Sequence, residues 1–308
     1  MKRWVVIGLV FGFVGMSGWM MFGPVSGKDE PGIFIVPEKQ AGWDVAVELA
    51  KQGFIRSQTG YWILYGGKPI ASGGYRLNKN MNLWQIIKRL AGQPDLAWVT
   101  VSHCLRREQI GEILQEKLGW DAGKLDKWNA QDKEGQFYPD TYLLPVDDPV
   151  EVTAQRFFDR FNEKFAPLAD KYLAENILWT TGVKIASLIA REAAGPEDMK
   201  LISGIIWNRL NSSMRLQIDA TMQYTRGKVD GRWWGNIDLE EKRKDSPYNT
   251  YLYKGLPPTP ICNPGIDAIE AALEPEETEC LFYLHDSGGQ IHCAKTYEEH
   301  VQNIKKYL

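Results

Sequence analysis

The sequence predicts an α+β protein in which an N-terminal membrane helix precedes two domains. An uncharged apolar run from Trp4 to Phe22 predicts the helix. Short strand and helix patterns alternate over residues 33–118 and predict a small α/β domain, while longer helices followed by a hairpin predict a second, α+β domain. A chain of 308 residues with 44% hydrophobic and 24% charged side chains has room for all three parts.

The N-terminus has the pattern of a membrane-spanning helix. Lys2 and Arg3 precede the apolar run, whose length at 1.5 Å per residue is roughly the ~30 Å of a bilayer core. Basic residues ahead of the span favour an orientation that leaves the rest of the chain outside the cytoplasm. A cleaved signal peptide is the competing interpretation, but no Ala-x-Ala site follows. We therefore predict an anchor and linker over residues 1–27 that cross the cell (inner) membrane once, with the remainder on the extracytoplasmic side.

The first domain is predicted over residues 31–130 and the second over residues 131–308. In the first, strands are expected at residues 33–36, 61–65 and 98–101, and helices at residues 43–52, 83–90 and 108–118. In the second, Asp148 is expected to cap a helix whose first residue is Pro149. Two further helices are expected on either side of Gly195-Pro196, and a hairpin is expected from Cys280 to Cys293.

Four cysteines, at positions 104, 262, 280 and 293, are compatible with an oxidising compartment but do not by themselves define a disulfide framework. Cys280 and Cys293 stand on the two strands of the expected hairpin. Whether they are bridged stays open, because the register of the hairpin does not follow from the sequence.

The helix that ends at Glu192 places a carboxylate on its apolar face, where burial disfavours the charged form. Ile185, Leu188 and Ile189 fall at i, i+3 and i+4, and Glu192 follows at i+7 on the same stripe, toward the core or a cleft. Burial disfavours the charged form, so such a Glu stays protonated to higher pH and can act as an acid near neutrality. The alternative is a Glu at a frayed helix end, since a Gly that suits a C-cap follows three residues later.

Several motifs around and beyond this helix agree in order and spacing with a known family. They are Phe137-Tyr-Pro-Asp-Thr-Tyr142, Asn208-Arg-Leu210, Met214-Arg-Leu-Gln-Ile-Asp-Ala-Thr221, Ser246-Pro-Tyr-Asn-Thr-Tyr251, Gly255-Leu-Pro-Pro-Thr-Pro-Ile261 and Asn263-Pro-Gly265. With Glu192 they resemble the endolytic murein transglycosylases of the YceG-like (MltG) family, from about Phe137 to the C-terminus. The resemblance implies that residues 131–308 form an α+β lytic transglycosylase catalytic domain.

The same resemblance implies a reaction and its acid. Lytic transglycosylases cleave the MurNAc-GlcNAc bond of peptidoglycan by letting the muramyl 6-hydroxyl attack its own anomeric carbon, which leaves a 1,6-anhydro end. One carboxyl that first protonates the leaving oxygen and then accepts the hydroxyl proton is enough, whereas hydrolases normally use two. Glu192 takes that role by resemblance. Family members often carry a second Glu two residues earlier, where this chain has Ala190.

Five more residues match family positions and are predicted to contact substrate: Gln217, Asp219, Tyr248, Asn249 and Thr250. Asp219 has a second interpretation as the cap of a helix that starts near Ala220, and this is the favoured one. Were Asp219 instead opposite Glu192, ordinary hydrolysis would become possible. The Tyr-Asn-Thr stretch is also a plausible turn.

The first domain resembles the LysM-like module that precedes the catalytic domain in the family, through Gly73-Gly-Tyr-Arg-Leu77 and Met81-Asn-Leu-Trp84. Such a module would hold the glycan strand, and the alternative is a plain α/β spacer. The chain departs from the family at Ser102-His-Cys104, where a Pro-Glu-Gly turn is usual. An insert over residues 226–244 carries Trp233-Trp234 and is either a sugar platform or a flap.

The expected partners are peptidoglycan glycan strands, the membrane and, by resemblance, the penicillin-binding synthases. A net charge of −3 does not favour a nucleic-acid partner. The four histidines are scattered and no zinc motif occurs, so neither a metal nor another cofactor is expected. The rival hypotheses are a non-catalytic glycan-binding scaffold of the cell-wall machinery and a peptidoglycan glycoside hydrolase.

Overall fold

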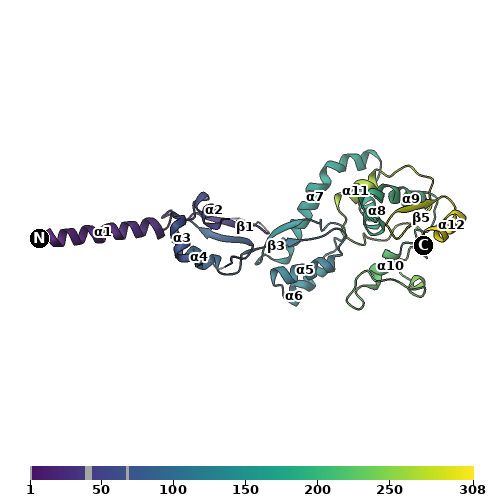
Figure 1. Cartoon of the computed structure of the whole chain (residues 1–308). Coiled ribbons are helices and arrows are strands. Elements are labelled where there is room, and N and C mark those ends of the chain that lie inside the picture. Colours follow the sequence, from purple (N-terminus) through teal and green to yellow (C-terminus); the bar gives the residue numbers. More distant parts are fainter. Residues whose placement is uncertain (1, 39–43, 67–68) are drawn as a thin grey trace. The chain divides into compact units, whose positions relative to one another are not determined.

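The chain is an α+β protein, as predicted, and it divides into two compact units (Figure 1). The computed structural model describes all residues except 1, 39–43 and 67–68, and it leaves the side chains of residues 2–6 and 8–11 undescribed. One unit comprises residues 1–99, 116–119 and 141–148, and the other comprises residues 100–115, 120–140 and 149–308. Each unit is built from several separate segments of the chain. The predicted division into domains at residues 31–130 and 131–308 therefore stays a prediction.

The first unit is built on a sheet with the strand order β1-β2-β3-β4. The strands are β1 (Pro31–Val36), β2 (Gly73–Asn78), β3 (Leu96–Thr100) and β4 (Thr141–Pro145), and the helices are α1 (Lys2–Phe22), α2 (Val45–Lys51), α3 (Gln58–Tyr65) and α4 (Leu83–Leu90). β1 and β2 pair antiparallel over their full length, from Pro31 opposite Asn78 to Val36 opposite Gly73. Their buried side chains pack with those of α2, α3 and α4 into one apolar core.

The segment predicted as a strand at residues 61–65 is helical, which corrects the prediction. The Ser57 side chain caps α3 by accepting a hydrogen bond from the Gly60 amide. Tyr61 and Tyr65 are then one helical turn apart and their rings stack at 4.8 Å, with Tyr61 fully buried. The aromatic and β-branched composition had favoured a strand, but packing of these rings decided the conformation.

The predicted membrane span forms one helix, α1, of 21 residues. Part of that prediction rests on residues 4–6 and 8–11, whose side chains lie outside the described part of the chain. Among the residues that were described, no helix has the length and apolar character needed to cross a membrane.

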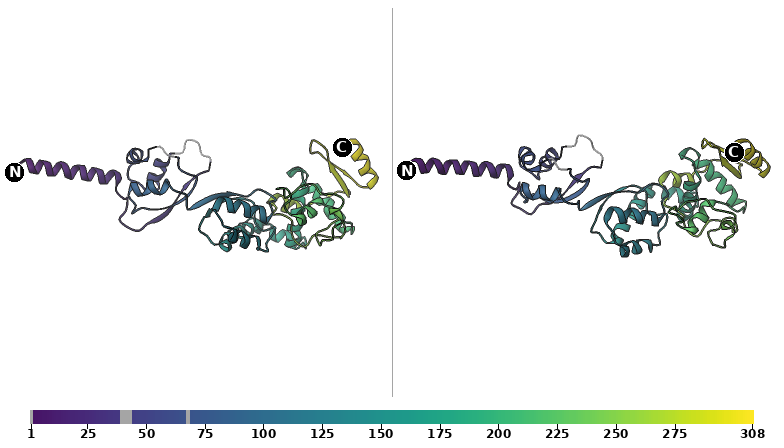
Figure 2. Two further views of the ribbon diagram at one scale, coloured as in Figure 1. Left: turned by 90° about the horizontal axis from the view of Figure 1, so that it is seen from below. Right: turned by 60° about the horizontal axis from the view of Figure 1, so that its bottom comes forward.

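The second unit holds most of the helices and a terminal hairpin. Its elements are α5 (Arg107–Leu118), α6 (Ala122–Asn129), α7 (Val150–Ala174), α8 (Trp179–Glu192), the 3-10 turn η1 (Pro196–Asp198), α9 (Met199–Asn211), α10 (Asp219–Arg226), η2 (Glu241–Arg243), α11 (Ile266–Leu273), β5 (Phe282–His285), β6 (Ile291–Ala294) and α12 (Tyr297–Tyr307). The predicted break at Gly195-Pro196 and the predicted hairpin are confirmed. Both views of Figure 2 show α12 beside that hairpin, against which it packs.

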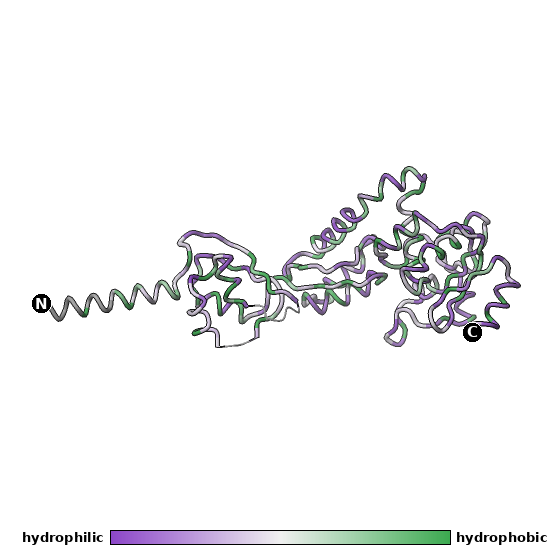
Figure 3. Tube along the Cα trace, turned by 45° about the horizontal axis from the view of Figure 1, so that its top comes forward, coloured by the Kyte–Doolittle hydropathy of each residue, from purple (hydrophilic) through white to green (hydrophobic). Residues whose placement is uncertain are grey.

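The helix α7 begins at Val150, one residue later than predicted. Pro149 has a ψ of 152° and is therefore extended, and its carbonyl accepts the first helical hydrogen bond, from the Thr153 amide. Pro149 is the N-cap itself, so the prediction that Asp148 would be the cap is wrong. Hydrophilic and hydrophobic residues alternate along α7 (Figure 3). The buried residues of this helix include Phe157 and Phe161.

The centre of the second unit is α8, which lies among α7, α9 and α11 (Figure 1). Ile185, Leu188 and Ile189 are fully buried, as the apolar stripe predicted. The approach of α7 is so close that a Cβ on Gly182 would stand 2.2 Å from the ring of Tyr172. A helix surrounded in this way has little freedom to shift, so the residue at its end is held in place.

All four cysteines are bridged, although the sequence by itself did not define a disulfide framework and left a Cys280–Cys293 bridge open. Cys104 pairs with Cys262 and Cys280 pairs with Cys293. The first pair is brought together by backbone hydrogen bonds between the segments around Leu105 and Asn263, 158 residues apart in sequence. Local sequence patterns cannot reveal a contact between segments so distant.

The two bridges should differ in their contribution to stability. A cross-link stabilises mainly by restricting the unfolded chain, and loops of 158 and 13 residues give roughly 5 and 3 kcal/mol. We therefore expect Cys104→Ser/Cys262→Ser to lose more unfolding free energy than Cys280→Ser/Cys293→Ser, by about 2 kcal/mol. Urea unfolding of both variants, beside the oxidised parent, measures this. Equal losses would contradict the loop-length argument.

Candidate active site

Glu192, the last residue of α8, meets the terminal hairpin. The hydroxyl of Tyr283 on β5 donates a hydrogen bond of 2.6 Å to the Oε2 atom of Glu192. Both side chains are half-buried, and Tyr283 packs against the apolar core around α8. The prediction that Glu192 continues the buried stripe, toward the core or a cleft, is confirmed.

The surroundings of Glu192 favour its protonated form. Burial raises the pKa of the Glu192 carboxyl, and the negative charge of Asp219 raises it further. The hydrogen bond from Tyr283 and the charges of Arg191 and His285 act against this and lower the pKa, but burial prevails. A carboxyl of this kind can hold a proton at a pH where an exposed Glu is ionised and can deliver it to a bound ligand.

The turn that follows Glu192 is fixed by Asp198. Its carboxylate accepts hydrogen bonds from the amides of Ala194 (3.0 Å) and Gly195 (3.2 Å). The same carboxylate also lies 2.6 Å from the Nε2 atom of His285. Because His285 and Tyr283 alternate along β5, they project from the same face of the strand. One face of β5 therefore holds both Glu192 and the turn after it.

The base of β5 is anchored by the end of α9. The side chain of Asn208 donates to the carbonyls of Thr278 (2.7 Å) and Cys280 (3.2 Å), and the buried Arg209 donates from Nε to the carbonyl of Leu281 at 2.6 Å. Arg209 also donates from Nη1 to the carbonyl of Leu216, just before Gln217. This one guanidinium ties β5 to the loop that leads into α10.

Asp219 is the first residue of α10 but does not cap it. The N-cap is Ile218, and the Asp219 carboxylate instead accepts hydrogen bonds from the hydroxyl of Tyr251 and from the ammonium of Lys242, the latter at 2.9 Å. The favoured interpretation of Asp219 as a helix cap is therefore wrong. The negative charge of Asp219 raises the pKa of the Glu192 carboxyl, so Asp219 lies close enough to Glu192 for the two charges to interact.

Gln217 has an unusual backbone next to this pair. Its φ of +55° lies in the left-handed region, which a non-glycine residue adopts at a cost, and its amide donates to the carbonyl of Thr250 at 3.0 Å. The Gln217 side chain is exposed and, within the described part of the chain, has no hydrogen-bond partner. It is thus available to a ligand, and the backbone that holds it is fixed.

Asn249 and Thr250 serve the loop itself, with exposed fractions of only 1% and 2%. The Asn249 amide donates to the carbonyls of Lys242 (3.1 Å) and Lys244 (2.7 Å) and accepts from the backbone of Tyr251 (2.9 Å). The Thr250 hydroxyl accepts from the amide of Ile218 at 3.0 Å. Both side chains therefore hold the loop in place. Direct contact with substrate stays a prediction for all five residues, Gln217, Asp219, Tyr248, Asn249 and Thr250.

Tyr248 joins the loop of residues 246–253 to the proline-rich loop of residues 255–261. Its hydroxyl shares a hydrogen bond of 2.7 Å with the hydroxyl of Thr259, and its ring packs on Tyr224 with centroids 5.1 Å apart. The ring is half-buried, which leaves part of its surface for a ligand.

The insert over residues 226–244 is docked through arginines. The guanidinium of Arg191 lies 4.1 Å from the ring centroid of Trp234, and that of Arg106 lies 4.7 Å from the ring of Trp233. The indole of Trp234 also donates to Gln109 at 3.0 Å. Both tryptophans are half-buried, so the insert packs against the residue that precedes Glu192.

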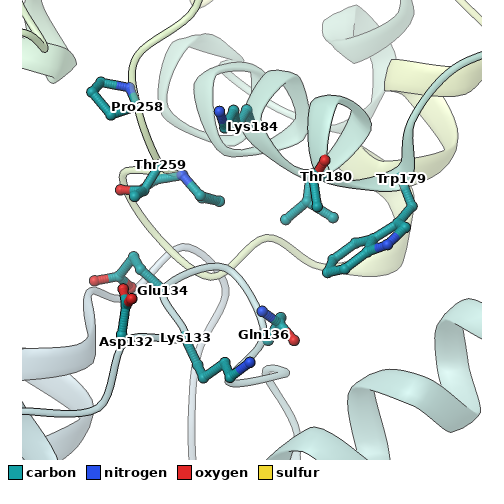
Figure 4. A pocket seen from close by; sticks show the side chains of 11 residues that line it. Asp132, Lys133, Glu134, Gln136, Trp179, Thr180, Lys184, Pro258 and Thr259 are labelled. Carbon is teal, nitrogen blue, oxygen red and sulfur yellow. The ribbon is translucent and has the colours of Figure 1, made fainter.

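A cavity of about 270 Å³ lies beside the first turns of α8 (Figure 4). Trp179 and Thr180 line one side and Lys133 and Gln136 the other, and Thr259 connects its rim to Tyr248. Glu134 at its edge is buried and accepts from Asn263 at 2.7 Å, and burial raises the pKa of Glu134 to about 7. The cavity and Glu192 thus belong to opposite ends of one helix.

The sequence analysis gave no role to the side chains that hold the two carboxyls or the turn beside them, namely Tyr283, His285, Tyr251 and Lys242. Alternation in the predicted strand could have placed Tyr283 and His285 on one face. It could not have shown what that face meets, because β5 and Glu192 are 91 residues apart in the sequence.

The chain is similar to known proteins over most of its length. The model of the YceG-like family matches residues 34–306. A Bacillus subtilis protein named endolytic murein transglycosylase is 28% identical over 97% of this chain and 91% of its own length. A Streptococcus pneumoniae protein of the same name is 31% identical over 57% of this chain, which spans about a third (32%) of that longer relative. The crystal structure of a YceG-like protein from Listeria monocytogenes has the same fold, with a TM-score of 0.60 and 24% identity over 89% of this chain and 99% of its own.

The buried position of Asn249 and the exposed position of Gln217 predict different effects of their substitution on stability. Asn249→Ala leaves buried backbone groups without partners and should lower the free energy of unfolding by roughly 1–3 kcal/mol. Gln217→Ala changes an exposed side chain and should stay within about 0.5 kcal/mol of the parent. Urea unfolding of both variants checks this, and an Asn249→Ala protein as stable as the parent would refute the positioning role.

Proposed function

The chain belongs to the YceG-like family, and we propose that Glu192 is the acid with which it cleaves peptidoglycan glycan strands. The protein is a peptidoglycan lytic transglycosylase, the activity in the names of its Bacillus and Streptococcus relatives. The observation that carries the assignment of Glu192 is its place at the end of a buried helix, where burial raises the pKa of its carboxyl and Tyr283 holds it.

The proposed mechanism needs one carboxyl group in two protonation states. Protonated Glu192 gives its proton to the departing glycosidic oxygen as the bond to the muramyl anomeric carbon breaks. The muramyl 6-hydroxyl attacks that carbon, and the Glu192 carboxylate accepts the hydroxyl proton. The product ends in 1,6-anhydro-MurNAc, no water is consumed, and Glu192 returns to its acid form for the next cycle.

The remaining predicted residues divide between substrate contact and support. Gln217 and Tyr248 offer exposed polar or aromatic surface to the sugars, and Asp219 stands where its charge acts on Glu192 and on any positive charge that develops at the anomeric carbon. Asn249 and Thr250 hold the loop from which these side chains project.

We also propose that α1 anchors the enzyme in the cell membrane, with both units on the extracytoplasmic side. Supporting this are Lys2 and Arg3 ahead of the uncharged run and the exposure of apolar side chains on the described part of α1, Phe13, Met16 and Met20 among them. The anchor would keep the enzyme near nascent strands and the penicillin-binding synthases. The LysM-like assignment of the first unit rests on its motifs and belongs to the same proposal.

A glycoside hydrolase is the second candidate, because Asp219 supplies a second carboxyl near Glu192. The two activities differ in their products: a hydrolase leaves reducing ends and a lytic transglycosylase leaves anhydro ends. Asp219 is held by Lys242 and Tyr251, which favours a fixed electrostatic role over activation of water.

The product test uses the full chain in detergent on purified glycan strands. The parent should release fragments with anhydro-muramyl ends, detected by mass spectrometry. Glu192→Gln keeps the shape of the side chain but cannot supply the proton, so its rate should fall at least ~100-fold. Reducing ends from the parent would favour the hydrolase. No cleavage, with strand binding intact, would favour a non-catalytic scaffold.

The charge of Asp219 should affect how the rate of glycan cleavage depends on pH. Protonated Glu192 is the active form in the first step, so the rate falls as pH rises through the pKa of Glu192. The Asp219 charge raises that pKa, so Asp219→Asn should move the falling limb to lower pH. Initial rates from about pH 4 to 9 measure the pH at which the rate falls. The matched control is Asp238→Asn, which changes an exposed acid of the insert. An unmoved limb would place Asp219 outside the field of Glu192.

A further inference from the structure

We propose that Tyr283 is a positioning residue that decides which oxygen of Glu192 delivers the proton, and that the hairpin β5–β6 is the frame that holds it there. This inference rests on the proposed role of Glu192 as the acid. It concerns a residue that none of the sequence motifs identified.

The hydrogen bond assigns separate tasks to the two carboxyl oxygens. Tyr283 donates to Oε2 at 2.6 Å, so Oε2 acts as an acceptor and the acidic proton resides on Oε1. We therefore expect Oε1 to be the atom that delivers the proton to the leaving oxygen. When the proton departs, the bond from Tyr283 is made to a carboxylate and becomes stronger, which stabilises the charge that Glu192 acquires in the first step.

The hydroxyl of Tyr283 is a suitable donor because it keeps its own proton. Burial and the charge of Glu192 raise the pKa of Tyr283 well above its ordinary value. Over the pH range of the reaction the group is therefore always a donor and never competes with Glu192 as a base.

The frame of Tyr283 is fixed on three sides. Within the hairpin Tyr283 lies opposite Cys293, which is bridged to Cys280 at the base of β5. Below it, Arg209 holds the carbonyl of Leu281. Beyond it, His285 is bound to Asp198. The oxygen of Tyr283 is thus placed against Glu192 by contacts that do not involve Glu192 itself.

The charged groups around Glu192 set the direction of the expected pH effect. Asp219 from α10 raises the pKa of Glu192, while Arg191 from α8 and His285 from β5 lower it. The charge of Arg209 from α9 also interacts with that of Glu192. The hydrogen bond from Tyr283 lowers the pKa of Glu192, so its removal raises that pKa, whereas loss of the Asp219 charge lowers it. The two changes therefore have opposite signs.

The test is Tyr283→Phe in the full chain, which removes one oxygen and keeps the ring. We expect kcat on glycan strands to fall about tenfold, because a charge-assisted hydrogen bond is lost, and the falling limb of the pH profile to move up by about one unit. A merely structural role would lower activity without moving the limb. The matched control is Tyr297→Phe, a change of the same kind on an exposed tyrosine whose ring lies 6.0 Å from Phe282.

The outcomes separate this inference from the proposed function. If the parent cleaves, Glu192→Gln does not, and Tyr283→Phe has the kcat and pH limb of the parent, the positioning role is overturned while the acid stands. If Glu192→Gln cleaves like the parent, the proposed function itself fails. Thermal unfolding of Tyr283→Phe beside Tyr297→Phe checks that a loss of activity is not a loss of fold. A limb that moves down would also contradict the assignment.

Discussion

The structure depends on the burial of α8, because the position and acidity of Glu192 both follow from it. The helix is enclosed by α7, α9 and α11, and even its polar Ser187 is fully buried, with the Ile261 amide donating to its hydroxyl at 3.1 Å. A carboxyl at the end of such a helix is drawn partly out of water. Desolvation then raises its pKa, and the neighbouring charges adjust the result without reversing it.

Glu192 and Asp219 are fixed by segments that are far apart in sequence, and Arg209 connects them. Its guanidinium binds the carbonyls of Leu281 and Leu216, which precede Tyr283 and Gln217 respectively. Removing the shared support would disturb both carboxyls together. This explains why Asn208 and Arg209 accompany the acid in the sequence although neither is a candidate for chemistry. Their role follows from the backbone groups that they bind.

The sequence was most informative where periodicity or a motif is local. The apolar stripe before Glu192, the break at Gly195-Pro196 and the terminal hairpin each depend on a few neighbouring residues, and each was predicted. The Cys104–Cys262 bridge and the contact of Tyr283 with Glu192 depend on tertiary packing across 158 and 91 residues. The motif around Asn249 marked the right loop, but only burial distinguishes a side chain that holds the loop from one that contacts substrate.

Keeping a partly buried acid has a consequence for stability. The folded-state pKa of Glu192 is raised, so the native state binds its proton more tightly than the unfolded chain, and the corresponding stabilisation is lost as pH rises through that pKa. Glu134, with a pKa of about 7 in the folded state, acts in the same direction. Both groups therefore weaken the second unit toward neutral and higher pH. The two disulfides and the packing of α8 stabilise the same unit and act against this loss.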